Sequence, residues 1–384
     1  MKKIIWILLI VSTFSCSKTK ERLPFKILKE DVLKLPLDMD MFEYWRNIQV
    51  IQNEGNDFIA ITHFRNDHTL YIYDLNNKKL HKKITYNLEG PNGIGKLFGF
   101  YYHNKDSIFI TNRLGHKMFL TNENAEVINS YNLIGEEGRA DTESGISWVH
   151  TKSPITKIGD LLYIPSLPYK DPYKYNYTNN GLLMEYDLDK KQFKYLLGYP
   201  DIYKNNGYWS KYKSVPSITK NKKNEFITNY PISENIYEMT PENNKLTLVG
   251  IPQNEFIDNI KPLNNITTDE SLITQNKLGT DEFYSIHYDL YRNVYYQIAR
   301  KAYDKESIKK IINGGKGTAQ NQYLRVINDQ FELIAEYALH GNDQESYSTS
   351  MIFISKDGLY IKLIPKNNKN EDEIQFRRFT FTHN

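Results

Sequence analysis

Cysteine is nearly absent from this chain of 384 residues, which contains only Cys16. A single thiol cannot form an intrachain disulfide, so the fold must be held together by its hydrophobic core. The charge is nearly balanced, with 49 Lys and Arg residues against 46 Asp and Glu residues and a formal net charge of +3. Nucleic-acid binding requires a strong, clustered basic excess, so we expect no nucleic-acid partner.

The short motifs that mark common catalytic and metal sites are missing as well. No HxH or HExxH pair occurs among the nine histidines, so we expect neither a metal site nor a cofactor. No GxSxG motif is present, so the sequence does not predict a nucleophilic serine at a strand-to-helix turn. These absences favour a protein without enzymatic activity, and no catalytic residue can be assigned.

Long apolar segments are confined to the N-terminus. Residues 1–15 contain two lysines, an apolar run and then small residues, which together are typical of a secretory signal peptide. The tetrapeptide TFSC resembles the lipobox of bacterial lipoproteins, and this resemblance implies lipid attachment at Cys16, with residues 16–26 as a tether. We therefore expect a cell-envelope protein that contacts the outer membrane through its lipid, on the periplasmic or surface face. An uncleaved N-terminal anchor is the alternative.

The rest of the chain contains a recurring strand–turn–strand unit, in which runs of β-branched and aromatic residues flank turns rich in Asn, Asp and Lys. Four strands per unit, repeated about every fifty residues, predict an all-β fold, a β-propeller that occupies residues 27–384 as a single domain. Six blades are expected; seven are the alternative, because residues 251–281 are hard to assign. A β-sandwich pair explains the repeats less well. The five complete units lie near 48–86, 98–133, 154–197, 215–250 and 282–339.

The last unit supplies only three strands, STSMIFISKDGLYIKLI followed by EIQFRRFTF. The early segment Ile27–Leu37 is predicted to add the fourth strand, which would close the ring and remove an exposed sheet edge. One helix is expected in the fifth unit, where Asp304 can cap KESIKKII and Gly314 can end it.

The stretch LEGPNGIGKLFGF, residues 88–100, comes nearest to a phosphate-binding motif, because Gly90, Gly95 and Lys96 reproduce the skeleton of a P-loop. Leu97 stands where a P-loop needs a hydroxyl for magnesium, and the residues that follow are strand-like. We interpret the glycines as turn residues that accept a positive φ.

Long and short connections are distributed unevenly in this pattern. A propeller opens the connections between blades, and between the second and third strands of a blade, on one face. All of the long segments fall into that class, whereas the other turns are tight. Long loops in compact domains are usually functional or disordered, so we expect a binding surface on one face around the central channel.

Tyrosines and tryptophan in two of these long loops are candidate contact residues, because rigid aromatic rings dominate binding hot spots. A second interpretation, that the rings pack the loops down, is equally open. Arg139 and His116 could reach the same face. The candidate ligand-binding residues are Tyr169, Tyr173, Tyr175, Tyr177, Tyr208, Trp209, Arg139 and His116.

The motifs EGPNGIGKLFGF and YDLYRNVYYQI, together with the lipoprotein-like start, resemble a family of bacterial lipoproteins described as a domain of unknown function, DUF4221. The resemblance implies a propeller-like envelope protein and carries no activity. We therefore expect a binding or scaffolding module for a peptide, glycan or partner protein. The alternative is an envelope carbohydrate-active hydrolase or lyase that uses acidic, His or Arg side chains at the channel mouth, with carboxylates available at Glu136, Glu137, Asp141 and Glu143.

Overall fold

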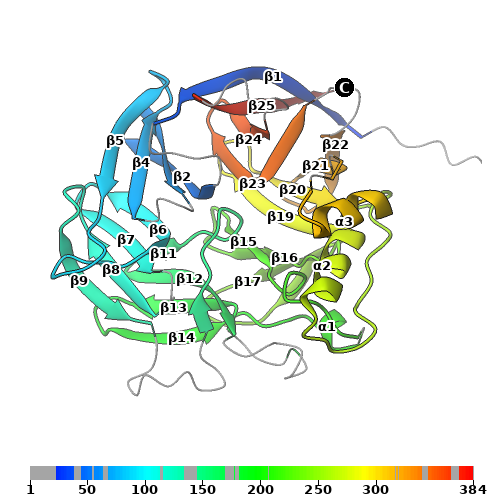
Figure 1. The fold of residues 1–384 in the computed structure, drawn as a ribbon, viewed down its shortest axis with the longest axis horizontal. Helices are drawn as coiled ribbons and strands as arrows, with labels where there is room; N and C mark the ends of the chain where they lie inside the picture. Colours follow the sequence, from blue (N-terminus) through cyan, green and yellow to red (C-terminus); the bar gives the residue numbers. More distant parts are fainter. Residues whose placement is uncertain are drawn as a thin grey trace, which may run out of the picture.

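The computed structural model describes residues 23–38, 45–53, 56–63, 68–112, 116–133, 145–168, 177, 181–205, 207–315, 317–318, 320–339, 345–364 and 372–383. Within them, antiparallel strands form six sheets that stand around a central axis as the blades of a β-propeller (Figure 1). The predicted fold class and the six blades are confirmed. No helix in the described residues is long and apolar enough to cross a membrane.

The first two blades follow one another along the chain, and each runs from an innermost to an outermost strand. The first consists of β2 (Trp45–Asn53), β3 (Asn56–His63), β4 (Thr69–Asp74) and β5 (Lys79–Thr85). The second consists of β6 (Leu97–Asn104), β7 (Ser107–Asn112), β8 (Lys117–Thr121) and β9 (Val127–Asn132).

The third blade differs, because two short strands, β10 (Gly145–Ser147) and β11 (Thr156–Ile158), share the inner edge of β12 (Leu161–Pro168). Strands β13 (Leu183–Asp187) and β14 (Gln192–Leu196) complete it. The fourth blade consists of β15 (Ser217–Lys220), β16 (Phe226–Asn229), β17 (Ile236–Met239) and β18 (Thr247–Gly250). The fifth consists of β19 (Glu282–Asp289), β20 (Val294–Arg300), β21 (Gln322–Ile327) and β22 (Leu333–Ala338).

The sixth blade joins the two ends of the chain. Strands β23 (Ser346–Ser355), β24 (Gly358–Ile364) and β25 (Glu373–His383) come from the C-terminal end, and β1 (Phe25–Pro36) pairs with β25 as the outermost strand. The register runs from Phe25 opposite His383 to Pro36 opposite Glu373. The predicted closure of the ring by the N-terminal strand is therefore correct.

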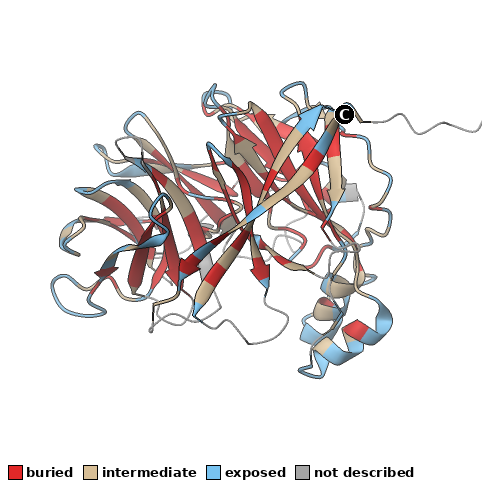
Figure 2. Ribbon diagram, turned by 90° about the horizontal axis from the view of Figure 1, so that it is seen from above, coloured by how far each residue is buried: buried red, intermediate tan, exposed pale blue. Residues whose placement is uncertain are grey.

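The hydrophobic core lies in layers between neighbouring blades (Figure 2). Strand β4 is buried at every position because the flat faces of its blade pack against blades on both sides. Outermost strands such as β5 alternate instead between exposed and more buried residues. This difference explains why inner strands read as continuous apolar runs and outer strands as alternating ones.

Strand direction alternates within a blade, so the connections divide between two faces. The tight-turn face carries the turns between the first and second strands and between the third and fourth. The long-loop face carries the remaining connections, which include α1 (Ile202–Asn205), α2 (Glu270–Gly279) and α3 (Lys305–Ile312). Helices α2 and α3 protrude together from one side of the ring (Figure 2). The predicted one-sided distribution of long segments is confirmed by this topology.

Two local predictions are also borne out. Asp304 caps α3, where its carboxylate accepts a hydrogen bond from the Ser307 N–H at 2.8 Å. Gly90 and Gly95 have φ values of 87° and 68° and lie in the turn before β6, with no helix after it. These residues therefore form a turn and not a P-loop, as predicted. Residues 251–281 form no blade; they contain α2.

Candidate functional site

The innermost strand of the third blade is interrupted by residues 148–155, which enter the centre of the ring. Ile218 N–H and Ser217 Oγ, both on the fourth blade, bind the Lys152 carbonyl at 3.1 and 2.7 Å. Thr151 Oγ1 lies 4.0 Å from Met351 Sδ on the sixth blade, and the His150 ring packs on Phe98 of the second. This segment, which we call the plug, therefore ties the third blade to its neighbours, the second and fourth blades, and to the sixth blade across the channel.

On the tight-turn side of the plug lies a pocket of about 210 Å³, lined by innermost strands and by Lys152. His287 borders it, and its Nε2 lies 3.0 Å from Ser285 Oγ. Burial, reinforced by the positive charge of Lys152, lowers the pKa of His287 to about 4. The imidazole is thus neutral at physiological pH.

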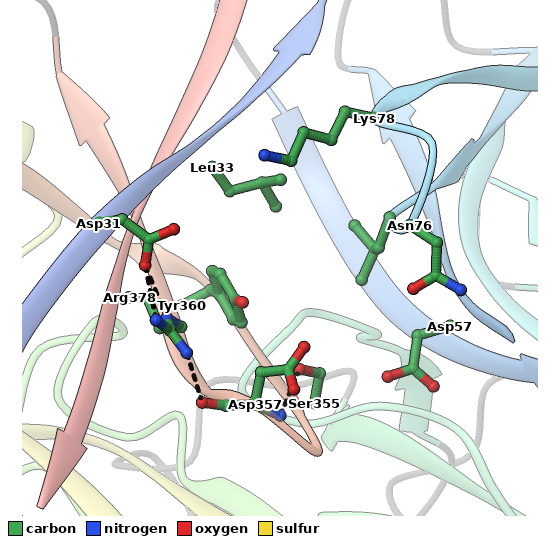
Figure 3. Close-up of a pocket in the computed structure, with 10 residues that line it drawn as sticks. Asp31, Leu33, Asp57, Asn76, Lys78, Ser355, Asp357, Tyr360 and Arg378 are labelled. Atoms are coloured by element: carbon green, nitrogen blue, oxygen red, sulfur yellow. Dashed lines mark hydrogen bonds and ion pairs between the residues drawn. The ribbon is translucent and has the colours of Figure 1, made fainter. Parts of the chain in front are cut away.

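A second pocket of about 280 Å³ lies on the tight-turn face at the seam between the sixth and first blades. Figure 3 shows Asp31, Arg378 and Asp357 on one side of it and Asp57, Asn76 and Lys78 on the other. Arg378 pairs with Asp31 at 2.7 Å. This pair links β1 to β25, so we assign it to ring closure.

The aromatic candidates fall into two groups in the structure. Tyr177 and Trp209 are buried, with 3% of each residue exposed. The Tyr177 hydroxyl accepts a hydrogen bond from the backbone N–H of Trp209 at 2.9 Å. Both rings join a cluster with Tyr199, Tyr203 and Tyr230. Their burial corrects the expectation that these two side chains stand on the binding surface; for them, the packing interpretation holds.

Tyr208 is accessible, with 38% of its surface exposed, and Tyr212, four residues later in the same loop, is exposed to the same extent although it was not among the candidates. The Leu263 N–H donates to the Tyr208 carbonyl at 2.6 Å, which fixes this loop against the segment before α2. The Lys277 ammonium on α2 lies 4.1 Å from the centre of the Tyr212 ring. Both rings therefore belong to the protruding part of the long-loop face.

The remaining candidates are less informative. His116 lies at the start of β8, partly buried, and its Nδ1 has no hydrogen-bond partner among the described residues. Cys16, Tyr169, Tyr173, Tyr175 and Arg139 lie outside the described residues, as do the acidic residues of the loop before β10.

Four cations that the sequence analysis did not select gather at the mouth of the channel on the long-loop face; they are Lys152, Lys213, Lys277 and Arg300. Lys213 is fully buried, and its ammonium lies 3.3 Å from a carboxylate oxygen of Glu282. It also donates to the Thr280 and Asp281 carbonyls at 3.3 and 3.0 Å. Glu282 begins β19, so these contacts hold the long segment before β19 against the fourth blade.

Arg300 ends β20 and lies beside the same carboxylate, 3.4 Å from Glu282 Oε1. Its Nε and Nη2 both donate to Thr349 Oγ1, at 3.1 and 2.7 Å. The guanidinium carbon lies 3.2 Å from the centre of the Tyr284 ring, and Lys152 Nζ lies 4.8 Å from the same ring. One tyrosine therefore brings together cations from the plug and the fifth blade.

Electrostatic shifts support this grouping. Burial lowers the pKa of Lys152 to about 8, and nearby Arg300 and Lys213 add to the effect although Glu282 opposes it. Partial burial of Lys277, which keeps an exposed surface, also lowers its pKa. Burial alone would raise the pKa of Glu282, but the surrounding cations outweigh it and lower that pKa. The mouth is thus an anion-attracting environment.

No group of three or more His, Cys, Asp or Glu side chains in the described ranges is placed to hold a metal ion. What the mouth offers chemically is several cations, one ionised carboxylate and aromatic rings. No sequence signal joins these residues, because they come from four segments that are far apart along the chain.

Comparison with known proteins places these features in context. The model of a family described as a domain of unknown function, DUF4221, matches residues 24–338. A crystal structure of a DUF4221 member from Bacteroides vulgatus is similar, with a TM-score of 0.79 at 20% identity, over 94% of this chain and 99% of that one. A virginiamycin B lyase from Staphylococcus aureus matches with a TM-score of 0.43 at 11% identity, over 92% of this chain and 99% of that one. No curated protein matches the sequence.

Proposed function

We propose a binding function for this chain, which belongs to the DUF4221 family, a family whose description assigns no activity. The protein is a lipid-anchored module of the cell envelope, and its long-loop face engages a peptide, glycan or partner protein. The lipid on Cys16 and the envelope location are part of the proposal and derive from the sequence of residues 1–16.

The main support for the proposal is that the long connections lie on one face of the ring. The three helices and the segment 251–281 all connect strands at the long-loop face. Tyr208 and Tyr212 are exposed on the same protrusion, in a loop that hydrogen bonds anchor. Rigid, accessible tyrosines held on a fixed scaffold are typical of recognition surfaces, because little entropy is lost when they bind.

The contacts at the mouth favour binding over the alternative of glycoside hydrolysis or lyase chemistry. Hydrolysis requires two carboxyl groups at a defined separation, one of them a proton donor. In the described part of the chain, Glu282 is the one carboxylate that contacts the mouth cations, and those cations lower its pKa. The ionised Glu282 carboxylate is therefore suited to holding the cations in position and not to donating a proton.

The test uses the purified chain and an immobilised panel of peptides and glycans. The double substitution Tyr208→Ala with Tyr212→Ala should weaken binding of the best ligand by about tenfold or more, since exposed aromatic hot spots contribute at this level. Circular dichroism should show an unchanged fold, because both side chains are 38% exposed.

The matched control lies on the opposite face. Leu290 and Tyr291, in the turn between β19 and β20, are 63% and 37% exposed, and the double substitution Leu290→Ala with Tyr291→Ala should leave binding unchanged. Loss of binding in the tight-turn variant, with full binding in the long-loop variant, would place the contact on the wrong face and refute the proposal.

A further inference from the structure

We infer that the mouth of the channel binds an oxyanion, a carboxylate or sulfate group carried by an acidic saccharide. The site consists of Lys152, Lys213, Lys277 and Arg300 around Glu282. This inference rests on the proposed function and specifies its ligand.

The charges of this cluster do not balance. Four cations converge, and Glu282 supplies one negative charge, which contacts Lys213 and Arg300. Four positive charges and one negative charge leave an excess of three. Lys213 and Arg300 are largely removed from water, with 0% and 17% of their side chains exposed. A cluster with this excess is costly unless an anion compensates it, so the excess indicates a missing anionic partner.

Two of the described cations, Lys152 and Lys277, make no ion pair with Glu282, which contacts Lys213 and Arg300. Lys152 Nζ donates to the Val215 carbonyl at 3.1 Å and lies 3.5 Å from the Tyr284 carbonyl. Carbonyl oxygens orient an ammonium group without cancelling its charge. The Lys277 ammonium lies over the Tyr212 ring and the residue is exposed, so this cation is accessible to a ligand.

The cluster is assembled from separate elements of the fold. Lys152 comes from the plug, Lys213 from the loop before β15, Lys277 from α2 and Arg300 from the end of β20. Each is held by contacts of its own, and Thr349 on the sixth blade fixes the guanidinium group of Arg300. A solvated charged patch needs no such convergence, whereas a preorganised binding site does.

A saccharide fits this arrangement better than a peptide because of Tyr212. Its ring is 38% exposed and lies beside Lys277. The C–H face of a pyranose ring can pack on an aromatic face while its carboxylate or sulfate group points toward the cations. The exposed Tyr208 in the same loop extends the apolar surface for a second sugar unit.

The experiment is calorimetric titration of the intact chain with five probes of matched concentration. These are an oligogalacturonide, a sulfated oligosaccharide, a neutral oligosaccharide of equal length, inorganic phosphate and a short poly-glutamate peptide. We expect both acidic saccharides to bind at least tenfold more tightly than the neutral one, with affinity that falls as salt rises. The tighter of the two identifies which oxyanion the site prefers.

Two matched lysines make the test specific. Lys277→Gln should weaken binding of the acidic saccharide about tenfold, because one charged contact is lost. Lys309→Gln, which removes an exposed lysine from neighbouring α3, should leave it unchanged. Both lysines are exposed, so neither substitution should unfold the protein.

Three results would overturn the inference. They are equal binding of neutral and acidic saccharides, an unchanged affinity in Lys277→Gln, and tighter binding of phosphate or poly-glutamate than of any saccharide. In each case the proposed binding function survives if Tyr208→Ala with Tyr212→Ala still weakens capture of the best ligand by about tenfold or more. It fails as well only if that double variant also behaves like the unmodified chain.

Discussion

Lys152 is a single residue whose place in the cation cluster at the mouth lowers the stability of the fold. Its pKa is lowered to about 8, first by burial and then by nearby Arg300 and Lys213, with Glu282 opposing; an unperturbed lysine lies at about 10.4. Between these values the unfolded chain binds a proton that the folded chain does not. The free energy of unfolding therefore rises with pH across that window, and below it the buried charge costs its full amount.

Lys152→Met should consequently raise the free energy of unfolding at pH 7, by about 1–3 kcal/mol. The gain should shrink as the pH rises toward 10, because the amine of the unmodified protein is then neutral in the folded state. Urea unfolding at pH 7 and at pH 10 measures both values. The control Lys245→Met, at an exposed lysine, should change stability by less than about 0.5 kcal/mol. A destabilised Lys152→Met at pH 7 would contradict this view.

Sequence patterns could identify types of residue near the site but not their orientation. Tyr208 and Trp209 are adjacent, yet Tyr208 is 38% exposed and Trp209 is 3% exposed. That difference arises because the Trp209 ring packs on Tyr203 of α1, and the Trp209 backbone N–H donates to the hydroxyl of Tyr177, which comes from a distant segment of the chain. The cations of the mouth were missed for the same reason, since they come together only once the blades close into a ring.

At the scale of elements, β1 should matter most to the stability of the ring. Leu35 is fully buried, pairs with Ile374 of β25 and belongs to the core between the sixth and first blades. Leu35→Ala should therefore lower the free energy of unfolding by about 2–4 kcal/mol. Lys34→Ala, at the exposed neighbouring position, is the control and should have little effect. Chemical denaturation measures both variants, and equal values for the two would show that β1 does not seal the core.

The elements themselves were largely predictable, because β-strands follow the alternation of apolar and polar residues and tight Asn- and Asp-rich turns separate them. Two departures have physical causes. The break between β10 and β11 is produced by contacts of the plug with the fourth blade, which local sequence does not encode. Helix α2 is capped by Asp269, but Ile273 is its one buried residue. Its apolar periodicity is therefore too weak to predict a helix from the sequence.

At the scale of the whole molecule, the ring depends on joining its two ends. Removal of residues 1–38 would delete β1 and leave the edge of β25 unpaired. Unpaired edges promote intermolecular pairing, so this truncated chain should dimerise or aggregate, as measured by size-exclusion chromatography with light scattering. A chain that lacks only residues 1–22 keeps β1 and should show no additional self-association under the same conditions. A monomeric, stable product of the longer truncation would contradict the closure mechanism.

The direction of β1 has a consequence for how the protein stands on a surface. Phe25, where β1 begins, is paired with His383 and lies at the tight-turn face. Residues 17–24 extend at most about 28 Å, so an acyl chain on Cys16 would keep the bilayer on that side. The mouth and the protruding helices would then face the solution on the side away from the membrane.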